Sequence, residues 1–260
     1  MLALITGASS GFGLEFARLH AQYGGDMIVV ARSKEKLEAL KKELETQYNI
    51  KVWVMVYDLS DPDAPDALFA EVQRLGVQVD MLINNAGFAV YGLFADTSWK
   101  SEEEMLQVNM MTLTRLTKLF VPGMIARRRG YIMQVASNAA FQPGPTMALY
   151  CATKAYVYYF SSALHNELKP YGVKVTCFMP GPTRTGFQDR ADMHASRLFK
   201  ILPVPEAAPI AKKGYRALLK GRRAAIPSLS VRLLQMGSKY SPWSLVIPIT
   251  RYLQGHKDIS

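Results

Sequence analysis

The sequence predicts an α/β fold with three layers, in which a doubly wound parallel sheet lies between two layers of helices. Short apolar runs of strand length alternate with longer segments whose apolar residues recur at helical spacing. A glycine-rich turn joins the first strand to the first helix. The 260 residues contain no internal repeat and no linker-like stretch, so we expect one domain over 1–260.

Six apolar runs predict the strands, because strands that are covered on both faces form nearly continuous apolar segments. They are Leu2–Ile5, Met27–Ala31, Val52–Val56, Met81–Ile83, Tyr131–Val135 and Val173–Phe178. Ligands of such sheets bind at the carboxyl ends of the strands. The residues that directly follow each run are therefore the first candidates for a site.

Helical patterns fill the intervals between these runs. The first begins at Gly11 and stops at Gly24–Gly25. The others are Ser33–Gln47, Asp66–Leu75, Ser101–Ala126, Leu149–Lys169 and about Glu206–Lys220. Prolines break the chain after Pro180, so we expect 186–220 to form a lid over the site and 226–260 to form a C-terminal tail.

The formal charge of +10 would suit an anionic partner such as nucleic acid or a membrane surface. The basic clusters Arg127–Arg129 and Lys212–Arg223 lie where helix ends and loops are expected, which favours a solvated surface and no nucleic-acid partner. Only Met1 precedes the first apolar run, so we expect no secretory signal and a cytoplasmic location. The spacing of Cys151 and Cys177 suggests neither a disulfide nor a metal site.

The glycine-rich turn Thr6–Gly13 predicts a phosphate-binding loop. Glycines allow the backbone to approach a pyrophosphate closely, and the amides at a helix N-terminus favour its negative charge. A purely structural turn is the alternative, but the strand-loop-helix context favours phosphate binding. The expected contact residues are Gly7, Ser9, Ser10, Gly11, Phe12 and Gly13.

The end of the second strand predicts which dinucleotide is bound. An acidic residue there would bind the adenosine ribose and repel a 2′-phosphate, but this chain has Ala31. Arg32 follows, then Ser33, and a guanidinium can bind a phosphate through two parallel hydrogen bonds. We therefore expect NADP(H) rather than NAD(H), the alternative being that Arg32 is only a solvated charge.

Tyr150 and Lys154 lie four residues apart on a predicted helix, so that one ligand can contact both. A tyrosine pKa of about 10 is high for proton transfer at neutral pH, and a nearby ammonium favours the phenolate. Ser137, directly after the fifth strand, can donate a hydrogen bond to a substrate oxygen. Asn109 lies on the preceding helix. Any one of these residues alone would be weak evidence, and the prediction rests on their occurring together.

These motifs resemble the short-chain dehydrogenase/reductase family over residues 2 to about 186. The turn fits its T-G-x-x-x-G-x-G signature, Asn84–Gly87 matches N-N-A-G, and Tyr150 with Lys154 matches Y-x-x-x-K. The resemblance implies a Rossmann fold and further cofactor contacts at Asp58, Leu59, Asn85, Ala86, Gly87, Tyr150, Lys154, Pro180, Gly181, Thr183 and Thr185. Stretches such as 139–145 look like the DltE-like branch, which is similar to the 17β-hydroxysteroid dehydrogenase and 3-ketoacyl reductase group.

The resemblance also implies a reaction, the transfer of a hydride between NADP(H) and a carbonyl or alcohol substrate. Asn109, Ser137, Tyr150 and Lys154 would form the catalytic tetrad. Tyr150 would exchange the proton, Lys154 would also hold the nicotinamide ribose, and Asn109 would position a water molecule. A homodimer or homotetramer is the family's expected assembly.

The expected pocket walls are apolar, which predicts a ketone, steroid or acyl substrate. They comprise Phe88, Val90, Phe141, Met147 and Phe187. A non-catalytic NADP(H)-sensing or scaffold protein is the alternative, and the complete tetrad argues against it. The tail mixes apolar residues with Arg232, Lys239, Arg251 and Trp243, which would allow peripheral membrane contact, but packing on the domain or on a partner subunit is the favoured interpretation. It has no uncharged apolar stretch long enough to predict a transmembrane segment.

Overall fold

A seven-stranded parallel sheet forms the centre of the protein in the computed structural model, which describes residues 1–187 and 204–255. The strand order is β3-β2-β1-β4-β5-β6-β7, and every neighbouring pair is parallel. The strands are β1 (Ala3–Thr6), β2 (Met27–Ala31), β3 (Val52–Val56), β4 (Met81–Asn84), β5 (Gly130–Val135), β6 (Val173–Phe178) and β7 (Ala224–Ala225). The chain crosses from one half of the sheet to the other between β3 and β4, so the doubly wound prediction is confirmed.

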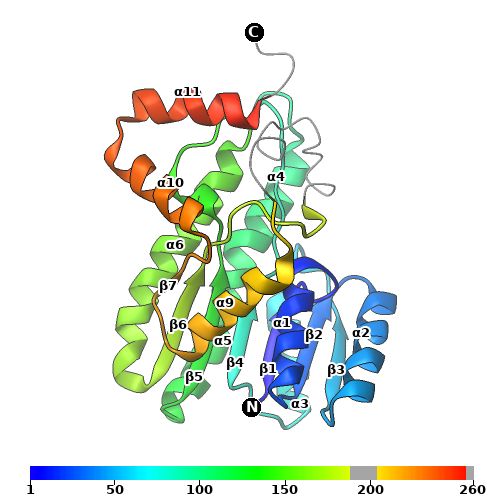
Figure 1. The fold of residues 1–260 in the computed structure, drawn as a ribbon. Coiled ribbons are helices and arrows are strands. Elements are labelled where there is room, and N and C mark those ends of the chain that lie inside the picture. The colour runs from blue at the N-terminus through cyan, green and yellow to red at the C-terminus, as the bar shows by residue number, and fades with distance from the viewer. Residues whose placement is uncertain (188–203, 256–260) are drawn as a thin grey trace.

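Helices cover both faces of the sheet (Figure 1). On one face α1 (Gly11–Gln22), α2 (Lys34–Gln47) and α9 (Ala207–Leu219) pack on inward residues such as Ile5 and Val29. The other face packs through the neighbouring residues Leu4 and Ile28, because side chains alternate along a strand. Its helices are α3 (Ala64–Arg74), α5 (Leu113–Ala126) and α6 (Ala148–Leu168), while α4 (Trp99–Leu106) packs on α6. Short helical turns η2 (Asn138–Phe141) and η3 (Lys169–Tyr171) flank α6.

The predicted helix Ser101–Ala126 is interrupted. A π-helical segment, η1 (Gln107–Thr112), joins α4 to α5. Such a segment inserts extra backbone into a helix, is rare, and occurs frequently at functional sites. Asn109 lies within it.

The described part of residues 186–220 does not form the predicted lid. Residues 188–203 lie outside the described residues. The helix α9 packs in the layer beside α1, where Tyr215 is buried and its hydroxyl lies 2.6 Å from His20 Nδ1. Residues 207–219 are therefore part of the sheet's cover, because their apolar side pairs with α1 and β6 rather than with the ligand cleft.

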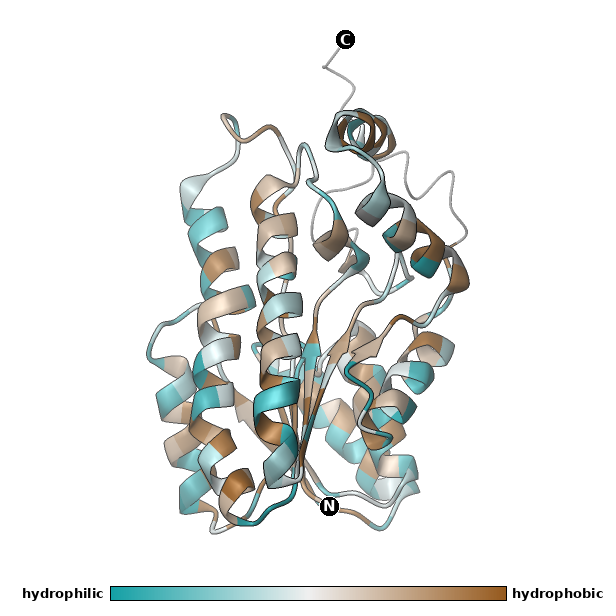
Figure 2. Ribbon diagram, turned by 90° about the vertical axis from the view of Figure 1, so that its left-hand side faces the viewer, coloured by the Kyte–Doolittle hydropathy of each residue, from teal (hydrophilic) through white to brown (hydrophobic). Residues whose placement is uncertain are grey.

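The tail folds into two helices, α10 (Leu229–Tyr240) and α11 (Trp243–Gln254), while residues 256–260 are outside the described range. Both lie beyond the carboxyl ends of the strands, and α11 is seen nearly end-on at the top of Figure 2. Neither these helices nor any other described helix combines the length and hydrophobicity needed to cross a bilayer.

Candidate active site

One large cleft, with a volume of about 1350 Å³, opens at the carboxyl ends of the strands. The structure brings nearly all the predicted site residues to its wall, with only Gly13 and Asn109 behind the wall. The predicted residues that line it are Gly7, Ser9, Ser10, Gly11, Phe12, Arg32, Ser33, Asp58, Leu59, Asn85, Ala86, Gly87, Ser137, Tyr150, Lys154, Pro180, Gly181, Thr183 and Thr185.

The glycine loop forms a cradle that has no room for side chains. Gly7 and Gly11 have φ angles of 66° and 54°, which L-residues with a Cβ adopt only with strain. A Cβ on Gly13 would lie 2.2 Å from the main-chain oxygen of Gly7, so this glycine allows α1 to pack against the loop. The cradle therefore fits a pyrophosphate group at the start of α1.

A hydrogen-bond network fixes the loop to the end of β4. The Thr6 hydroxyl accepts from the main-chain amides of Asn85 and Ala86, each at 3.0 Å. The side-chain amide of Asn85 donates to the main-chain oxygens of Thr6 and Gly7, at 3.0 and 3.2 Å. Asn85 therefore supports the loop from behind, a structural role beyond the cofactor contact predicted from the sequence.

Arg32 lies at one end of the cleft with its guanidinium 3.7 Å from the carboxylate of Asp58. Both side chains are about half exposed, at 57% and 51%, so their ion pair is screened by water and weak. Ser33 begins α2 and accepts a hydrogen bond from the amide of Lys36, which also lines the cleft. Two cations, Arg32 and Lys36, thus line this end of the cleft together with the carboxylates of Glu35 and Asp58, and no glutamate or aspartate follows β2 directly.

Tyr150 and Ser137 meet on the inner wall of the cleft. Tyr150 is buried in the first turn of α6, and Ser137 lies just beyond β5, where its oxygen accepts from the amide of Ala139 at 3.2 Å. Burial raises the pKa of the Tyr150 phenol above its ordinary value, and a hydrogen bond with Ser137 acts in the opposite direction. The phenol therefore holds its proton at neutral pH and can serve as a proton donor.

Lys154 lies one turn after Tyr150 and is almost fully buried. Its ammonium donates to the main-chain oxygen of Val135 at 3.0 Å. Burial lowers the pKa of this ammonium to about 8, against a smaller opposite effect of Cys177. A buried lysine whose pKa of about 8 lets it gain or lose its proton near neutral pH therefore lies beside the phenol.

Asn109 is fully buried behind Lys154 and does not reach the cleft. Its side-chain oxygen accepts from the amide of Phe88 at 3.2 Å, while its nitrogen donates to the Phe88 main-chain oxygen at 3.0 Å and to the Thr153 hydroxyl at 3.1 Å. Gly87 lies against this group, since a Cβ there would be 2.9 Å from the Asn109 oxygen and 3.3 Å from Lys154 Nζ. Asn109 thus ties the irregular segment that follows β4 to α6.

The apolar half of the cleft has a different composition from the one predicted. Phe88, Met147 and Phe187 line it, and the Phe187 ring lies 5.6 Å from that of Tyr150. Phe141 packs on Tyr158 at 5.5 Å in a separate core cluster, so its assignment to the pocket was wrong.

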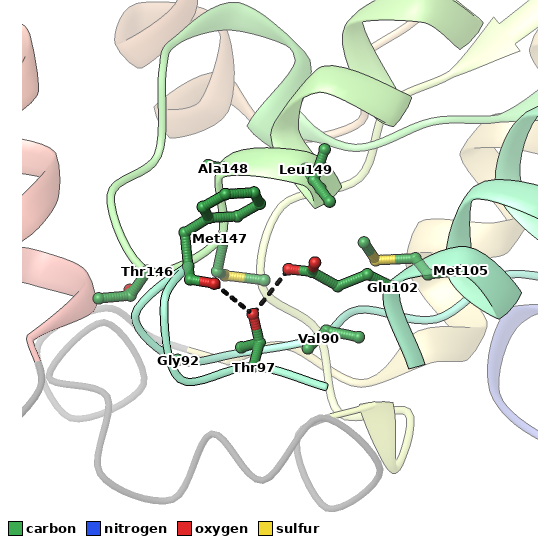
Figure 3. A pocket seen from close by; sticks show the side chains of 10 residues that line it. Val90, Gly92, Thr97, Glu102, Met105, Thr146, Met147, Ala148 and Leu149 are labelled. Atoms are coloured by element: carbon green, nitrogen blue, oxygen red, sulfur yellow. Dashed lines mark hydrogen bonds between the residues drawn. The ribbon is translucent and has the colours of Figure 1, made fainter. Parts of the chain in front are cut away.

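Val90 also faces away from the cleft, into a small cavity of about 30 Å³ between the Thr97–Met105 stretch and the start of α6 (Figure 3). The Thr97 hydroxyl donates there to Glu102 at 2.7 Å. This space has room for about one water molecule, not for a substrate.

Many of the residues that the sequence analysis missed come from α10 and α11. Apolar side chains of both helices line the cleft: Leu233, Leu234, Leu245, Val246, Ile249 and Leu253. The amphipathic pattern of the tail was the available signal, but the pattern alone does not say which element it covers. Gln254 ends this wall, and Tyr91 fixes it by donating to its main-chain oxygen at 2.7 Å.

Comparison with known proteins agrees with this geometry. Residues 1–195 match the family model of the short chain dehydrogenases. The chain belongs to this family. Short-chain dehydrogenases are NAD(P)-dependent oxidoreductases, and this one is similar to several with described substrates.

A very-long-chain 3-oxoacyl-CoA reductase of Phaeosphaeria nodorum is 37% identical over 179 residues, which are 67% of this chain and 52% of that protein. The chain thus spans about half the length of that relative. A short-chain dehydrogenase of Sphingobium yanoikuyae, solved with NADPH, is 31% identical with a TM-score of 0.83, covering 90% of this chain and 91% of the other. A bulky-bulky ketone specific alcohol dehydrogenase of Comamonas testosteroni is 28% identical with a TM-score of 0.79, covering 90% of each chain.

Proposed function

We propose that this protein is an NADPH-dependent reductase of apolar carbonyl compounds, with Tyr150 as the general acid. The observation that carries the proposal is the position of the Tyr150 phenol, between a cradle that fits a dinucleotide and a wall built from apolar side chains. The Sphingobium relative, solved with NADPH, and the ketone-specific relative support the same assignment.

The residues at the inner wall divide the chemistry between them. Ser137 would donate a hydrogen bond to the substrate oxygen and hold it beside the phenol. Tyr150 would then give its proton to that oxygen, since its raised pKa keeps the phenol protonated at neutral pH. Bound NADPH would supply the hydride to the carbonyl carbon.

Lys154 and Asn109 would act in support of Tyr150. Lys154 would hold the ribose hydroxyls next to the nicotinamide and, while charged, lower the cost of forming the phenolate. Asn109 would be a positioning residue, because its side-chain amide is occupied by Phe88 and Thr153. Arg32, with Lys36 nearby, would select the 2′-phosphate of NADPH.

The substrate class follows from the apolar half of the cleft. The relatives that act on 3-oxoacyl-CoA and on bulky ketones are consistent with it. Each methylene buried against such a wall contributes about 0.8 kcal/mol, or roughly a fourfold gain in kcat/KM where the gain is realised in the transition state. Short polar ketones would lack this contribution.

Kinetics with NADPH and a series of methyl ketones of increasing chain length would test the proposal, with a sugar ketone as the polar comparison. We expect kcat/KM to rise with each added carbon until the cleft is filled. A flat series would refute the apolar substrate class. NADPH binding without turnover of any carbonyl compound would instead support a non-catalytic sensor or scaffold.

A further inference from the structure

Helix α10 exposes an apolar stripe on the outside of the molecule. Leu229, Leu233, Met236 and Tyr240 are all exposed, and their spacing of three and four residues places them along one face of the helix. Trp243, the first residue of α11, is exposed at the end of the same stripe. These five residues are called the α10 stripe below.

The net charge of the protein is concentrated in the same part of the chain. Ten of its 31 lysine and arginine residues, and none of its 21 aspartate and glutamate residues, lie between residues 207 and 257. The rest of the sequence holds 21 residues of each sign and is neutral overall. The net charge of +10 is thus that of the segment from α9 onward, in which six of the ten cations lie on or just after α9 and four lie from α10 onward.

Basic side chains accompany the stripe on the two helices. Arg232 and Arg251 are exposed on α10 and α11, and the Arg232 Nε donates to the main-chain oxygen of Ile226 at 3.0 Å. An exposed apolar stripe with cations beside it, on two helices that contain no aspartate or glutamate, is complementary to an anionic lipid surface. Lipid headgroups supply the negative charge, and the acyl region accepts the apolar side chains.

The stripe is also continuous with the opening of the cleft. Leu233 belongs to both, and Leu234 lies beside it in the cleft wall. Figure 2 shows hydrophobic colouring on much of α11 and on parts of α10, at the end of the molecule that carries the cleft. A surface in contact with the stripe would therefore face the cleft opening.

We propose that the α10 stripe docks this protein peripherally on an anionic lipid bilayer, with the cleft opening toward the lipid. The docking itself does not depend on the proposed reaction. Its consequence, that apolar carbonyl substrates reach the cleft from the bilayer, rests on the proposed function and would fail with it.

Sedimentation of the full chain with vesicles tests the docking. We would compare phosphatidylcholine vesicles with vesicles that also contain roughly one third phosphatidylserine. The protein should sediment with the anionic vesicles and much less with the neutral ones. Raising the salt from about 0.1 M to about 0.5 M should weaken binding, because the Debye length shortens.

Two matched double variants separate the stripe from apolar surface in general. M236S/Y240S alters side chains that are 58% and 75% exposed, whereas M111S/Y159S alters the same residue types at 61% and 72% exposure away from α10. Loss of two large apolar groups should weaken binding roughly tenfold or more in M236S/Y240S. M111S/Y159S should bind as the unmodified protein does, and unchanged melting temperatures would show that both variants fold.

The fluorescence of Trp243 gives a second readout of docking, which can be measured on the unmodified protein. Its emission should shift to the blue with anionic vesicles, and W243F should lack that part of the shift. The proposal would be overturned if the unmodified protein stayed in solution with anionic vesicles at low salt, or if both double variants lost binding equally. It would also be overturned if light scattering showed a dimer that M236S/Y240S converts to a monomer, because a second copy would then cover the stripe.

Discussion

The side-chain nitrogen of Lys154 lies 5.7 Å from the centre of the Tyr150 ring, one helical turn further along α6. Both side chains are buried, and burial is the main cause of the pKa shift of each group. The pKa of the phenol is raised while that of the ammonium is lowered. The first two predictions concern these two groups.

Tyr150→Phe should abolish most turnover and leave cofactor binding nearly intact. The ring keeps its packing against Phe187, but the phenol proton beside Ser137 is lost. We expect kcat to fall by about 10² to 10⁴, the usual contribution of a general acid. Stopped-flow reduction assays and NADPH titrations would measure the two effects.

Tyr156→Phe is the matched control on the same helix. Its hydroxyl bonds to Thr114 at 2.8 Å and does not line the cleft. Its turnover should stay close to that of the unmodified protein. Substantial activity in Tyr150→Phe would exclude the phenol as the acid.

NADPH affinity should weaken as the pH rises from about 7 to about 9. The Lys154 ammonium, with a pKa of about 8, loses its proton in this range and with it a charged donor to the cofactor. The dissociation constant should rise nearly tenfold, because the ammonium is about nine-tenths deprotonated when the pH is one unit above its pKa. Lys154→Met has no such group, so its lower affinity should not change over this range.

Protein stability should respond to the same group in the opposite direction. The pKa is lower in the folded protein, about 8 against 10.5, so the unfolded chain binds more protons between these values. The contribution of Lys154 to the free energy of unfolding therefore rises with pH there.

An NADPH dissociation constant that stays level from pH 7 to 9 would contradict the role given to the ammonium.

The sheet could be predicted closely because its signal is local. Val52–Val56 and Val173–Phe178 are apolar runs flanked by turns, and the structure gives both strands the predicted bounds. The two-residue strand β7 has no such run and pairs only because α9 returns the chain to β6. The residues that directly follow the strands also line the cleft as expected, because the carboxyl ends of parallel strands lie at the same edge of the sheet.

Features that depend on packing between distant segments could not be predicted. Helical periodicity does not reveal a π-helical segment, so the tight enclosure of Asn109 was not foreseen. Phe141 lies shortly after a strand, where residues of a pocket are expected. Its ring instead packs against the ring of Tyr158 in the core. The α10 and α11 helices were expected only as a tail, because their cleft contacts join residues far apart in the sequence.

Arg32→Ala should reduce the preference for NADPH over NADH by roughly tenfold to a hundredfold. The guanidinium is the group best placed for the 2′-phosphate, and a charge-assisted contact contributes about 1.5 to 3 kcal/mol. Calorimetric titration with both dinucleotides gives the ratio directly. Lys34→Ala removes an exposed cation from the same helix that does not line the cleft, and it should leave the ratio unchanged. Equal affinities for both dinucleotides in the unmodified protein would remove the basis of this assignment.

Gly87→Ala should damage the active site through Asn109. The added Cβ would lie 2.9 Å from the Asn109 oxygen and 3.3 Å from Lys154 Nζ, and hydrogen bonds to Phe88 and Thr153 keep Asn109 from moving aside. Overpacking of this kind costs about 1 to 3 kcal/mol, so we expect a lower melting temperature and a kcat reduced by roughly tenfold or more.

Gly237→Ala is the control for the glycine substitution itself. Gly237 lies within α10 and lines the cleft, with no atom of another element within 4 Å of its would-be Cβ. Alanine should stabilise the fold by up to about 1 kcal/mol by favouring the helix, and the melting temperature should therefore rise. A double-mutant cycle with Asn109→Ser then locates the damage. If the clash with Asn109 is the cause, Gly87→Ala should cost much less in the Asn109→Ser background. An equal cost in both backgrounds would show that Gly87 acts on the cofactor cradle or on Lys154 alone, and the positioning role of Asn109 would lose its support.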